Sequence, residues 1–382
     1  MNEELKILIA PDSFKGSLSA TKITDILYKK LSISDLPLKL ILLPLADGGE
    51  GSLEAIMHSR KFQVVKIKVL NPQFKEIDAI YLVDKHNNTA YIELAQASGL
   101  GLINGKNDIM HVSTYGTGQM IKHAIENVNS KIILFLGGSA TCDAGLGIAD
   151  ALGMKFYNLE HQKIDPLPEI MYEISDFDST ASILNAKNVE ILMAVDVNNP
   201  FFGENGASYV YSPQKGANQE QVKLLDGGLR NLAQIIKNKT AIDLQNVPGS
   251  GAAGATAGSL HAFFNAKIIK GTEFIFNLIG LEEKIRQADL VISGEGKIDS
   301  QSMNNKLLYG ISRLTAKYNK KLWGICGYFD GDDGLKKNLF LDKVFNLAGS
   351  KAEIVDSVVN AEKRLEDICK KIVLDIKHLI YN

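Results

Sequence analysis

The sequence predicts an α/β protein of more than one domain, because short apolar runs alternate with helical stretches along the chain. The chain has 382 residues, which at about 150 residues per domain indicates two or three domains. Apolar residues make up 45% and charged residues 23% of the sequence. These values are ordinary for globular proteins and unlike those of disordered, collagen-like or coiled-coil chains.

The beginning of the chain is expected to form a β-α-β unit. Residues 6–10 predict a buried strand, and Ser17 or Ser19 can cap the helix that follows it. Residues 38–43 predict the next strand, and a further helix is expected to begin near Ser52.

Residues 64–94 have a different pattern, which predicts an antiparallel meander. Apolar and basic residues alternate over 64–69, as in a half-exposed strand. Two further apolar runs flank the turn-like sequence His86-Asn87-Asn88, the expected hairpin tip. A second domain is expected to begin here.

Helix-strand alternation then returns for the rest of the chain. Residues 155–190 are polar and lack strong motifs, so we expect a peripheral insertion there. Strands are expected at 131–136, 190–195, 289–293 and 321–326, and helices at 118–127, 251–264 and 361–379.

Charge and cysteine content exclude several kinds of protein. The 42 Lys and Arg residues nearly balance the 44 Asp and Glu residues, so the chain has no general attraction to nucleic acid or anionic membranes. Cys142, Cys326 and Cys369 form no CxxC motif, which excludes a zinc ribbon or disulfide scaffold and fits a reducing cytosol. No run of about 18 apolar residues and no basic start before an apolar core occurs, so neither a membrane-spanning helix nor a secretory signal is expected.

Glycines gather beside Asp, Ser and Thr where several strands are expected to end. In open α/β sheets ligands bind beyond the carboxyl ends of the strands, and glycine lets backbone amides approach an anion. Nearby carboxylates suit Mg²⁺ or proton abstraction. One such loop is ordinary turn chemistry, but several together predict a site for phosphate, a metal ion and a small polar substrate. The segments are 10–16, 46–51, 136–143, 195–200 and 293–299.

The absence of several known motifs excludes other enzyme classes. The sequence has no GxxxxGK[ST] motif and no HRD, DFG or VAIK string, which excludes a P-loop and a protein kinase. Residues 249–254 match GxGxxG, but Pro248 and a polar stretch precede them instead of a strand. A phosphate contact at a helix start, or close helix packing, is therefore favoured over a dinucleotide site. The histidines lack metal-ligand spacing and no GxSxG motif occurs, which argues against a zinc site or hydrolase triad.

Charged side chains in the glycine-rich loops are the candidates for chemistry, and each has a structural alternative. Asp196 follows an apolar strand and is expected to point into a cleft, unless it only forms an Asx turn before Pro200. Asp47 and Glu295 lie in glycine-dense loops, where turn formation is an equal alternative. Lys15 is expected to pair with a substrate carboxylate or phosphate, with a solvated lysine as the alternative.

Several of these segments carry longer motifs that come in a fixed order along the chain. They are Ala10-Pro11-Asp12-Ser13-Phe14-Lys15-Gly16-Ser17, 46–51, 137–141, 195–200, Pro213-Gln214-Lys215-Gly216-Ala217 and 294–301. Together they resemble the type-1 glycerate kinases of bacteria, and the resemblance covers residues 6–301.

The resemblance implies two α/β domains with an active site in the interdomain cleft. Residues 1–64 and 268–382 would form a Rossmann- or flavodoxin-like domain with a parallel sheet built from both chain ends. Residues 65–267 would form an inserted domain with mixed or antiparallel strands.

The resemblance also implies ATP-dependent phosphorylation of D-glycerate with Mg²⁺ in a cytoplasmic setting. The expected product is 2-phosphoglycerate, with 3-phosphoglycerate as the alternative. The expected partners are D-glycerate and ATP, with no nucleic acid and no membrane, and the chain is expected to be a monomer or a homodimer.

Phosphoryl transfer needs positioning, neutralised charge and a base near the hydroxyl, and this gives the candidate residues their roles. Asp196 is expected to be the base, with Lys15 and Glu295 as further catalytic residues. The expected contacts to nucleotide phosphates are Gly137, Gly138, Ser139, Thr141, Gly249, Gly251 and Gly254. Substrate contacts are expected from Ser13, Lys15, Asp47 and Lys297, and Mg²⁺ ligands from Asp47, Glu295 or Asp299.

Two other functions remain open at this point: a kinase for another small hydroxy acid, and a non-catalytic metabolite sensor that keeps the cleft. A sensor usually carries an added DNA-binding or signalling module, and none is recognised in the sequence. The chain departs from the family pattern at Asn305-Lys306-Leu307-Leu308 and at Cys326-Gly327-Tyr328-Phe329-Asp330. The shape of that edge of the site is expected to differ.

Overall fold

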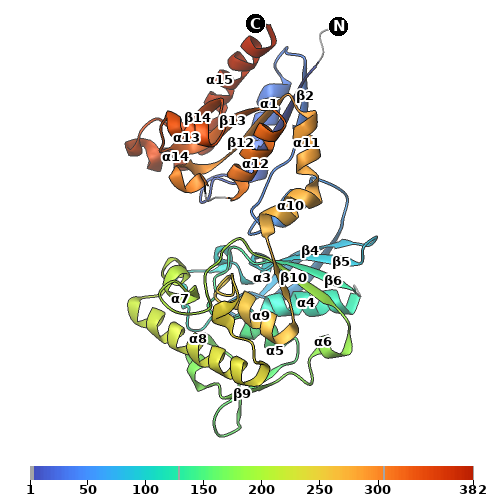
Figure 1. The fold of residues 1–382 in the computed structure, drawn as a ribbon, viewed down its shortest axis with the longest axis vertical. Coiled ribbons are helices and arrows are strands. Elements are labelled where there is room, and N and C mark those ends of the chain that lie inside the picture. The colour runs from blue at the N-terminus through green and yellow to red at the C-terminus, as the bar shows by residue number, and fades with distance from the viewer. Residues whose placement is uncertain (1–3, 128–129, 304–305, 382) are drawn as a thin grey trace. The chain divides into compact units, whose positions relative to one another are not determined.

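The computed structural model describes residues 4–127, 130–303 and 306–381, and the chain divides into two compact units (Figure 1). Unit 1 consists of Met1–Asp47, Glu54–Lys61 and Thr272–Asn382. Unit 2 consists of Gly48–Leu53 and Phe62–Gly271. Asn305, in the segment that departs from the family pattern, lies outside the described residues.

Unit 1 is built on a parallel sheet with the strand order β14-β13-β12-β1-β2. Its strands are β1 Leu5–Pro11, β2 Leu38–Leu42, β12 Leu290–Ile298, β13 Lys321–Phe329 and β14 Lys343–Ala348. The first strand is apolar and buried over residues 7–11, as expected for the interior of a parallel sheet. Counted along the chain, the order is 2-1-3-4-5, which is the flavodoxin-like order. The expected parallel sheet built from both chain ends is confirmed.

Helices from both ends of the chain cover the sheet of unit 1. They are α1 Ala20–Ser32, α11 Leu281–Gln287, α12 Lys306–Lys317, α13 Asp333–Asn338, α14 Ile354–Val359 and α15 Ala361–Tyr381, with most of α10 Gly271–Ile279. Of the two caps considered for α1, Ser19 is the one used, since its side chain accepts a hydrogen bond from the amide of Lys22 at 3.1 Å. Helices α1 and α15 pack together over the sheet in one apolar core that includes Leu27 and Leu365.

Unit 2 is built on a mixed sheet with the strand order β11-β10-β6-β5-β4-β3. Its strands are β3 Gln63–Leu70, β4 Glu76–Asp84, β5 Thr89–Glu93, β6 Lys131–Phe135, β10 Glu190–Ala194 and β11 Lys267–Ile269. Strand β4 pairs with β3 and β5 in antiparallel fashion, whereas β5, β6, β10 and β11 pair in parallel. The expected meander is confirmed, with Asn88 in the left-handed region (φ 46°) at the hairpin tip.

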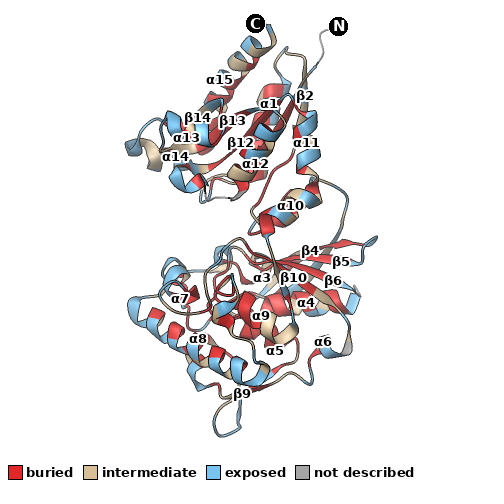
Figure 2. Ribbon diagram, viewed as in Figure 1, coloured by how far each residue is buried: buried red, intermediate tan, exposed pale blue. Residues whose placement is uncertain are grey.

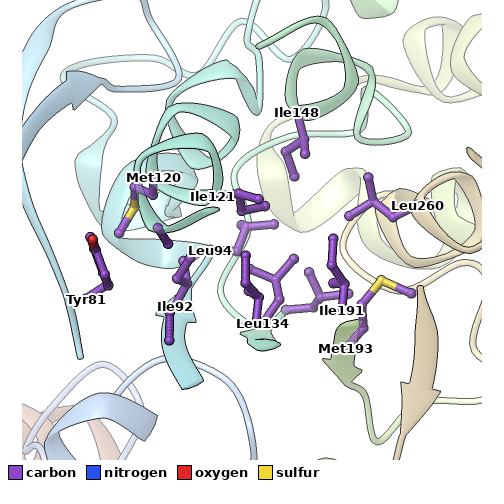
Figure 3. Close-up of a cluster of buried hydrophobic side chains, with 14 of the residues drawn as sticks. Tyr81, Ile92, Leu94, Met120, Ile121, Leu134, Ile148, Ile191, Met193 and Leu260 are labelled. Atoms are coloured by element: carbon purple, nitrogen blue, oxygen red, sulfur yellow. The ribbon is translucent and has the colours of Figure 1, made fainter. Parts of the chain in front are cut away.

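The helices of unit 2 enclose two apolar cores. They are α3 Ala95–Ser98, α4 Tyr115–Asn127, α5 Leu146–Ala151, α6 Ile183–Ala186, α7 Ala207–Tyr211, α8 Gln219–Thr240 and α9 Thr256–Phe264, and α2 Ser52–Met57 begins in this unit. Figure 3 shows the core against the main sheet, where Ile92, Leu134 and Ile191 come from neighbouring strands. In Figure 2 the long helix α8 is buried along one side, where Leu225, Leu229 and Leu232 join the second core.

Two expectations about unit 2 need correction. The helix expected from Gly251 begins at Thr256, because residues 249–255 form a turn with several left-handed residues. The insertion expected at 155–190 contains a small antiparallel sheet with the strands β7 Lys155–Tyr157, β8 Lys163–Ile164 and β9 Asp176–Asp178. Among the described helices of both units, none combines the length and the apolar character needed to cross a membrane.

Candidate active site

In unit 1, a pocket opens at the switch point of the sheet, where the strand order reverses between β1 and β12. Strand β1 lies between β2 and β12, and the amide of Asp12 donates to the carbonyl of Gly294 at 2.9 Å. Such a switch point is where open α/β sheets bind ligands. The pocket has a volume of about 380 Å³. Its polar lining includes Asp12, Ser13, Lys15, Glu295 and Lys297, and its apolar lining includes Phe14, Leu347, Ile354 and Val358.

The carboxyl group of Asp12 is the most perturbed acid of this pocket. It is only 6% exposed. Burial, reinforced by the carboxylate of Asp47, raises the pKa of Asp12 to about 7, although the amide of Ser13 donates to Oδ1 at 2.7 Å. The ammonium group of Lys15 favours the ionised form of Asp12 and Glu295 opposes it. Asp12 therefore changes charge near neutral pH.

Lys15 is an exposed cation inside this acidic group. Its Nζ lies 3.5 Å from Oδ2 of Asp47, and this carboxylate is the main cause that raises the pKa of Lys15. A lysine held in this way keeps its charge and can form an ion pair with an anionic ligand. The predicted residues Ser13, Lys15, Asp47, Glu295 and Lys297 are thus gathered at one end of the sheet of unit 1.

Lys297 is engaged by two carboxylates. Its Nζ lies 2.8 Å from Asp299 and 3.0 Å from Asp330. The contact with Lys297 lowers the pKa of Asp299, which lies outside the pocket lining. Asp299 therefore forms an ion pair with Lys297.

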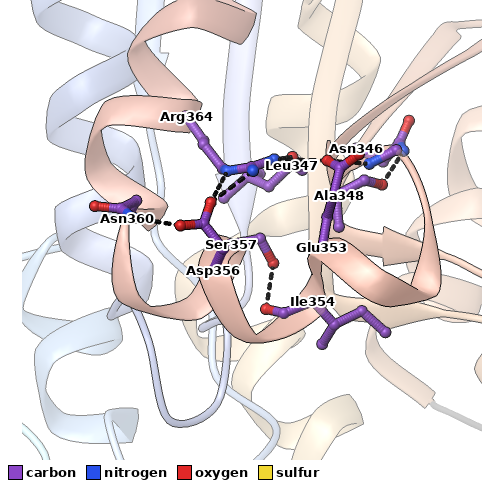
Figure 4. A network of polar contacts seen from close by, with 10 residues as sticks. Asn346, Leu347, Ala348, Glu353, Ile354, Asp356, Ser357, Asn360 and Arg364 are labelled. Carbon is purple, nitrogen blue, oxygen red and sulfur yellow. Dashed lines mark hydrogen bonds and ion pairs between the residues drawn. The ribbon is translucent and has the colours of Figure 1, made fainter.

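A hydrogen-bonded network fixes the apolar wall of the pocket (Figure 4). The guanidinium group of Arg364 donates to the carbonyl of Leu347 at 2.7 Å, to Glu353 at 2.9 Å and to Asp356 at 2.6 Å. These contacts join α15, β14 and α14, and the last two elements supply Leu347, Ile354 and Val358 to the pocket.

In unit 2, a glycine-rich loop follows β6 and is held by tight backbone packing. A Cβ atom on Gly137 would lie 2.3 Å from Cα of Gly49, so only glycine permits this approach. Gly138 is left-handed, with φ 76°, and its carbonyl accepts from the amide of Leu100 at 2.9 Å. Within the described residues, the amides of Gly138 and Ser139 have no hydrogen-bond partner. Free amides next to a left-handed glycine are suited to an anion.

Two further carbonyls of this loop, those of Ala140 and Thr141, are bonded to buried side chains of unit 2. Nδ2 of Asn107 donates to the carbonyls of Ala140 at 3.1 Å and Lys215 at 2.7 Å. Nζ of Lys215 donates to Oγ of Ser139 and to the carbonyl of Thr141, both at 2.7 Å. Burial lowers the pKa of Lys215 to about 8.

The end of the loop is fixed by Asp143, which is fully buried. Its carboxylate accepts from the amide and the hydroxyl of Thr114, at 2.8 and 2.7 Å, and from the amides of Gly145 and Gly147. Burial nevertheless raises the pKa of Asp143. The donors show that this acid organises the start of α5.

Asp196 follows β10, the neighbour of β6 in the sheet of unit 2. Since Ala194 is paired with Phe135, the segment from Asp196 and the glycine-rich loop leave the same edge of the sheet. Asp196 is half-buried there.

The Gly249–Gly254 loop packs against both of these segments. Gly251 donates to the carbonyl of Asn199 at 3.0 Å, and a Cβ on Gly251 would lie 2.2 Å from the carbonyl oxygen of Pro200. A Cβ on Gly254 would lie 2.3 Å from the carbonyl oxygen of Thr141. Close packing thus accounts for both glycines. The 3₁₀ helix Leu244–Asn246, and no strand, precedes this loop, which confirms that the dinucleotide fingerprint lacks its context.

The expected Mg²⁺ ligands Asp47, Glu295 and Asp299 all lie in unit 1. Among the described side chains, no three of His, Cys, Asp or Glu are placed to hold a metal ion. Mg²⁺ needs only one or two protein carboxylates when phosphate oxygens supply other ligands. Asp47 and Glu295 fit this requirement, since both interact with Asp12 and Lys15 in one acidic group. Asp299 fits less well because of its ion pair with Lys297.

Several residues important to this geometry were not predicted as site residues. Lys215 and Asn107 support the loop from inside unit 2, and Asp12 is the perturbed acid of the pocket. Lys215 and Asp12 stand inside recognised motifs, which was the available signal. Asn107 stands in no motif, and only the folded chain places it behind Ala140.

Three comparisons with known proteins agree with the motifs. The model of the "Glycerate kinase family" matches residues 7–377. The chain is 36% identical to glycerate 2-kinase from Escherichia coli strain K12 over 347 residues, 91% of each chain. It is 31% identical to glycerate kinase from Bacillus cereus over 369 residues, 96% of this chain and 97% of the relative.

A solved structure extends the likeness to the fold. The crystal structure assigned to glycerate kinase 2 from Salmonella typhimurium LT2 has a TM-score of 0.79 and 33% identity to this chain, and the match covers 98% of this chain and 99% of the other. The α/β fold and the phosphotransferase class expected from the motifs are confirmed. The chain belongs to the glycerate kinase family.

Proposed function

We propose that this protein transfers the γ-phosphoryl group of ATP to O2 of D-glycerate and releases 2-phosphoglycerate. The observation that carries the proposal is the 36% identity, over 91% of both chains, to a relative named glycerate 2-kinase. The alternatives of another hydroxy-acid substrate or of a sensor have no comparable support.

The loop after β6 is the proposed contact to the nucleotide phosphates. Gly138 and Ser139 have amides without a partner among the described residues, and Ser139 and Thr141 add hydroxyl groups. Donors of this kind stabilise the charge on a phosphoryl group in its transition state. Gly137 permits the close packing of the loop, and the Gly249–Gly254 loop supports it from the side of Thr141.

The pocket of unit 1 is the proposed contact to the acid substrate. Lys15 would pair with the carboxylate of glycerate, and Ser13 would donate to it, with Lys297 and Asp47 setting the charge nearby. The volume of about 380 Å³ exceeds what a three-carbon acid needs and leaves room for water or a phosphate group.

Asp196 is the proposed base that orients and deprotonates the hydroxyl, and Glu295 is proposed as an electrostatic partner in the acidic group of Lys15. Such a base contributes roughly 10²- to 10⁴-fold in rate. Mg²⁺ held by Asp47 or Glu295 would neutralise charge on the phosphates.

The test is an ADP-release assay with product identification. D-glycerate is expected to be the best substrate among D-glycerate, L-glycerate, tartronate and glycolate. Addition of enolase alone should then convert the product to phosphoenolpyruvate, because enolase accepts the 2-phospho isomer directly. A product that needs phosphoglycerate mutase as well would show transfer to O3, and no ADP release with D-glycerate would refute the proposal.

A further inference from the structure

Lys215 is a buried cation directly behind the loop that follows β6. Lys215 is 5% exposed, and its Nζ lies 2.7 Å from both Oγ of Ser139 and the carbonyl oxygen of Thr141. The lysine is the last residue of the 3₁₀ helix Pro213–Lys215, and its own carbonyl accepts from Nδ2 of Asn107 at 2.7 Å. Both ends of the residue are therefore fixed within unit 2.

The direction of the hydrogen bond to Ser139 follows from chemistry. An ammonium group has three donors and no acceptor, so Oγ of Ser139 must accept. The hydroxyl proton of Ser139 then remains available for donation to another group. A phosphate oxygen, which only accepts, is the matching partner.

Three carbonyls of the loop are also held by donors inside unit 2. Those of Gly138, Ala140 and Thr141 accept from Leu100, Asn107 and Lys215 respectively. A carbonyl oxygen facing a bound phosphate would repel it. With these acceptors engaged inside the unit, the loop offers the amides of Gly138 and Ser139 and the Ser139 hydroxyl as donors.

We propose that Lys215 is a positioning residue, which holds the Ser139 hydroxyl as a hydrogen-bond donor and the Thr141 carbonyl away from the nucleotide phosphates. The proposal rests on the nucleotide role of this loop in the proposed function. At 5% exposure Lys215 acts through Ser139 and Thr141 and does not itself contact the nucleotide.

The experiment compares Lys215→Met with a matched control, Lys187→Met. Lys187 is also a partly buried lysine of unit 2, and its Nζ donates to the carbonyl of Ile125 at 3.1 Å. Calorimetry of ATP binding and steady-state kinetics are measured on both variants. Lys215→Met should weaken ATP binding about 10- to 100-fold, the scale expected for a lost charge-assisted hydrogen bond. The KM for glycerate should change less than about twofold, and Lys187→Met should match the wild type in both quantities.

Two further measurements separate positioning from general destabilisation. Ser139→Ala removes one hydroxyl group and should weaken ATP binding by a similar factor, and the double variant should lose little more than either single one. In Lys215→Ala, added methylamine or ethylamine should restore part of the ATP affinity by supplying the missing ammonium group.

The results that overturn the proposal are distinct from those that overturn the proposed function. Unchanged ATP affinity in Ser139→Ala would show that Lys215 is only structural. Equal losses for ATP and glycerate in Lys215→Met, together with no amine rescue of Lys215→Ala, would show the same. If Lys215→Met does not fold, the Ser139→Ala result decides. A wild-type protein that binds ATP but releases no ADP with D-glycerate refutes the proposed substrate, while the calorimetric comparison still tests Lys215.

Discussion

The ammonium group of Lys15 lies 3.5 Å from the carboxylate of Asp47, at the edge of a pocket that also contains Asp12 and Glu295. Lys15 therefore interacts with three carboxyl groups, and its charge attracts an anionic substrate more strongly when some of these groups are protonated. The ion pair between Lys15 and Asp47 should therefore affect how tightly the pocket binds an anionic substrate.

Replacing Lys15 by alanine removes the cation proposed to hold the substrate carboxylate. The KM for glycerate should rise about 10- to 100-fold, with a smaller change in kcat, because the carboxylate does not react. Steady-state kinetics with each substrate varied in turn measure the change. Lys351→Ala, at another exposed lysine of unit 1, is the control. A rise in the KM for ATP alone would show that Lys15 belongs to the nucleotide site and not to the glycerate site.

The charge of Asp12 should control substrate binding near neutral pH. Its pKa is raised to about 7 by burial and by Asp47, so the group is neutral below this pH and ionised above it. The additional negative charge beside Lys15 should raise the KM for glycerate as the pH increases from 6 to 8. Asp12→Asn should make the profile flatter over this range, and a profile identical to that of the wild type would contradict the assignment.

Asp196→Asn tests the proposed base. The substitution keeps the size of the side chain and removes its capacity to take a proton, so kcat should fall by roughly 10²- to 10⁴-fold. Circular dichroism should show an unchanged fold. The control is Asp165→Asn, at an exposed aspartate of unit 2. Near-normal kcat in Asp196→Asn would remove this residue from the role.

Arg364→Met should loosen the wall of the pocket in unit 1. The arginine joins Leu347, Glu353 and Asp356, so its loss should increase hydrogen exchange of the amides of α14. Arg286→Met removes a comparable contact to Glu283, at 2.6 Å, far from α14 in the sequence, and should leave that exchange unchanged. Equal exchange in both variants would show that the network does not stabilise the wall.

Glu93 should make the stability of unit 2 depend on pH. This acid is 3% exposed at the end of β5, and burial raises its pKa from 4.5 to about 7, although the amide of Leu53 donates to it. The folded state therefore binds a proton more tightly than the unfolded state, so the contribution of Glu93 is most favourable at low pH and is lost as the pH rises through 7.

Scanning calorimetry at pH 5 to 8 measures this effect by comparison of the wild type with Glu93→Gln. The difference in stability between the two proteins should change by about 1–3 kcal/mol over this range, in favour of the variant at high pH. Glu126→Gln, at an exposed glutamate of α4, should follow the wild type. A constant difference between Glu93→Gln and the wild type would contradict the raised pKa.

The sequence predicted the features that depend on local pattern. The apolar strands, the hairpin tip at Asn88 and the motif-bearing loops after β1, β2, β6 and β10 are in the structure, because local residue pattern marks them. The expected loop at 293–299 is wrong, since residues 293–298, Glu295 included, continue strand β12 and pair with β13. The small sheet at residues 155–178 was not foreseen, since its strands have two or three residues each and carry no usable periodicity.

The roles of buried polar residues were less accessible to sequence reasoning. Lys215 reads as a loop lysine until the fold buries it behind Ser139, a residue 76 positions earlier in the chain. Asn107 has no local pattern that marks it. Asp12 was visible as a loop acid, but its raised pKa depends on burial and on Asp47, which only the folded chain brings near.

The central strand of unit 1, β1, pairs on one side with β12, which begins at Leu290, whereas unit 2 ends at Gly271. During synthesis on the ribosome, the whole of unit 2 emerges before β12, the partner strand of β1, emerges. One edge of β1, in the first 47 residues, therefore remains unpaired during this time, and unit 2 can fold first. Truncation between residue 271 and the start of β12 at Leu290 leaves this amino-terminal segment as the aggregation-prone part of the chain.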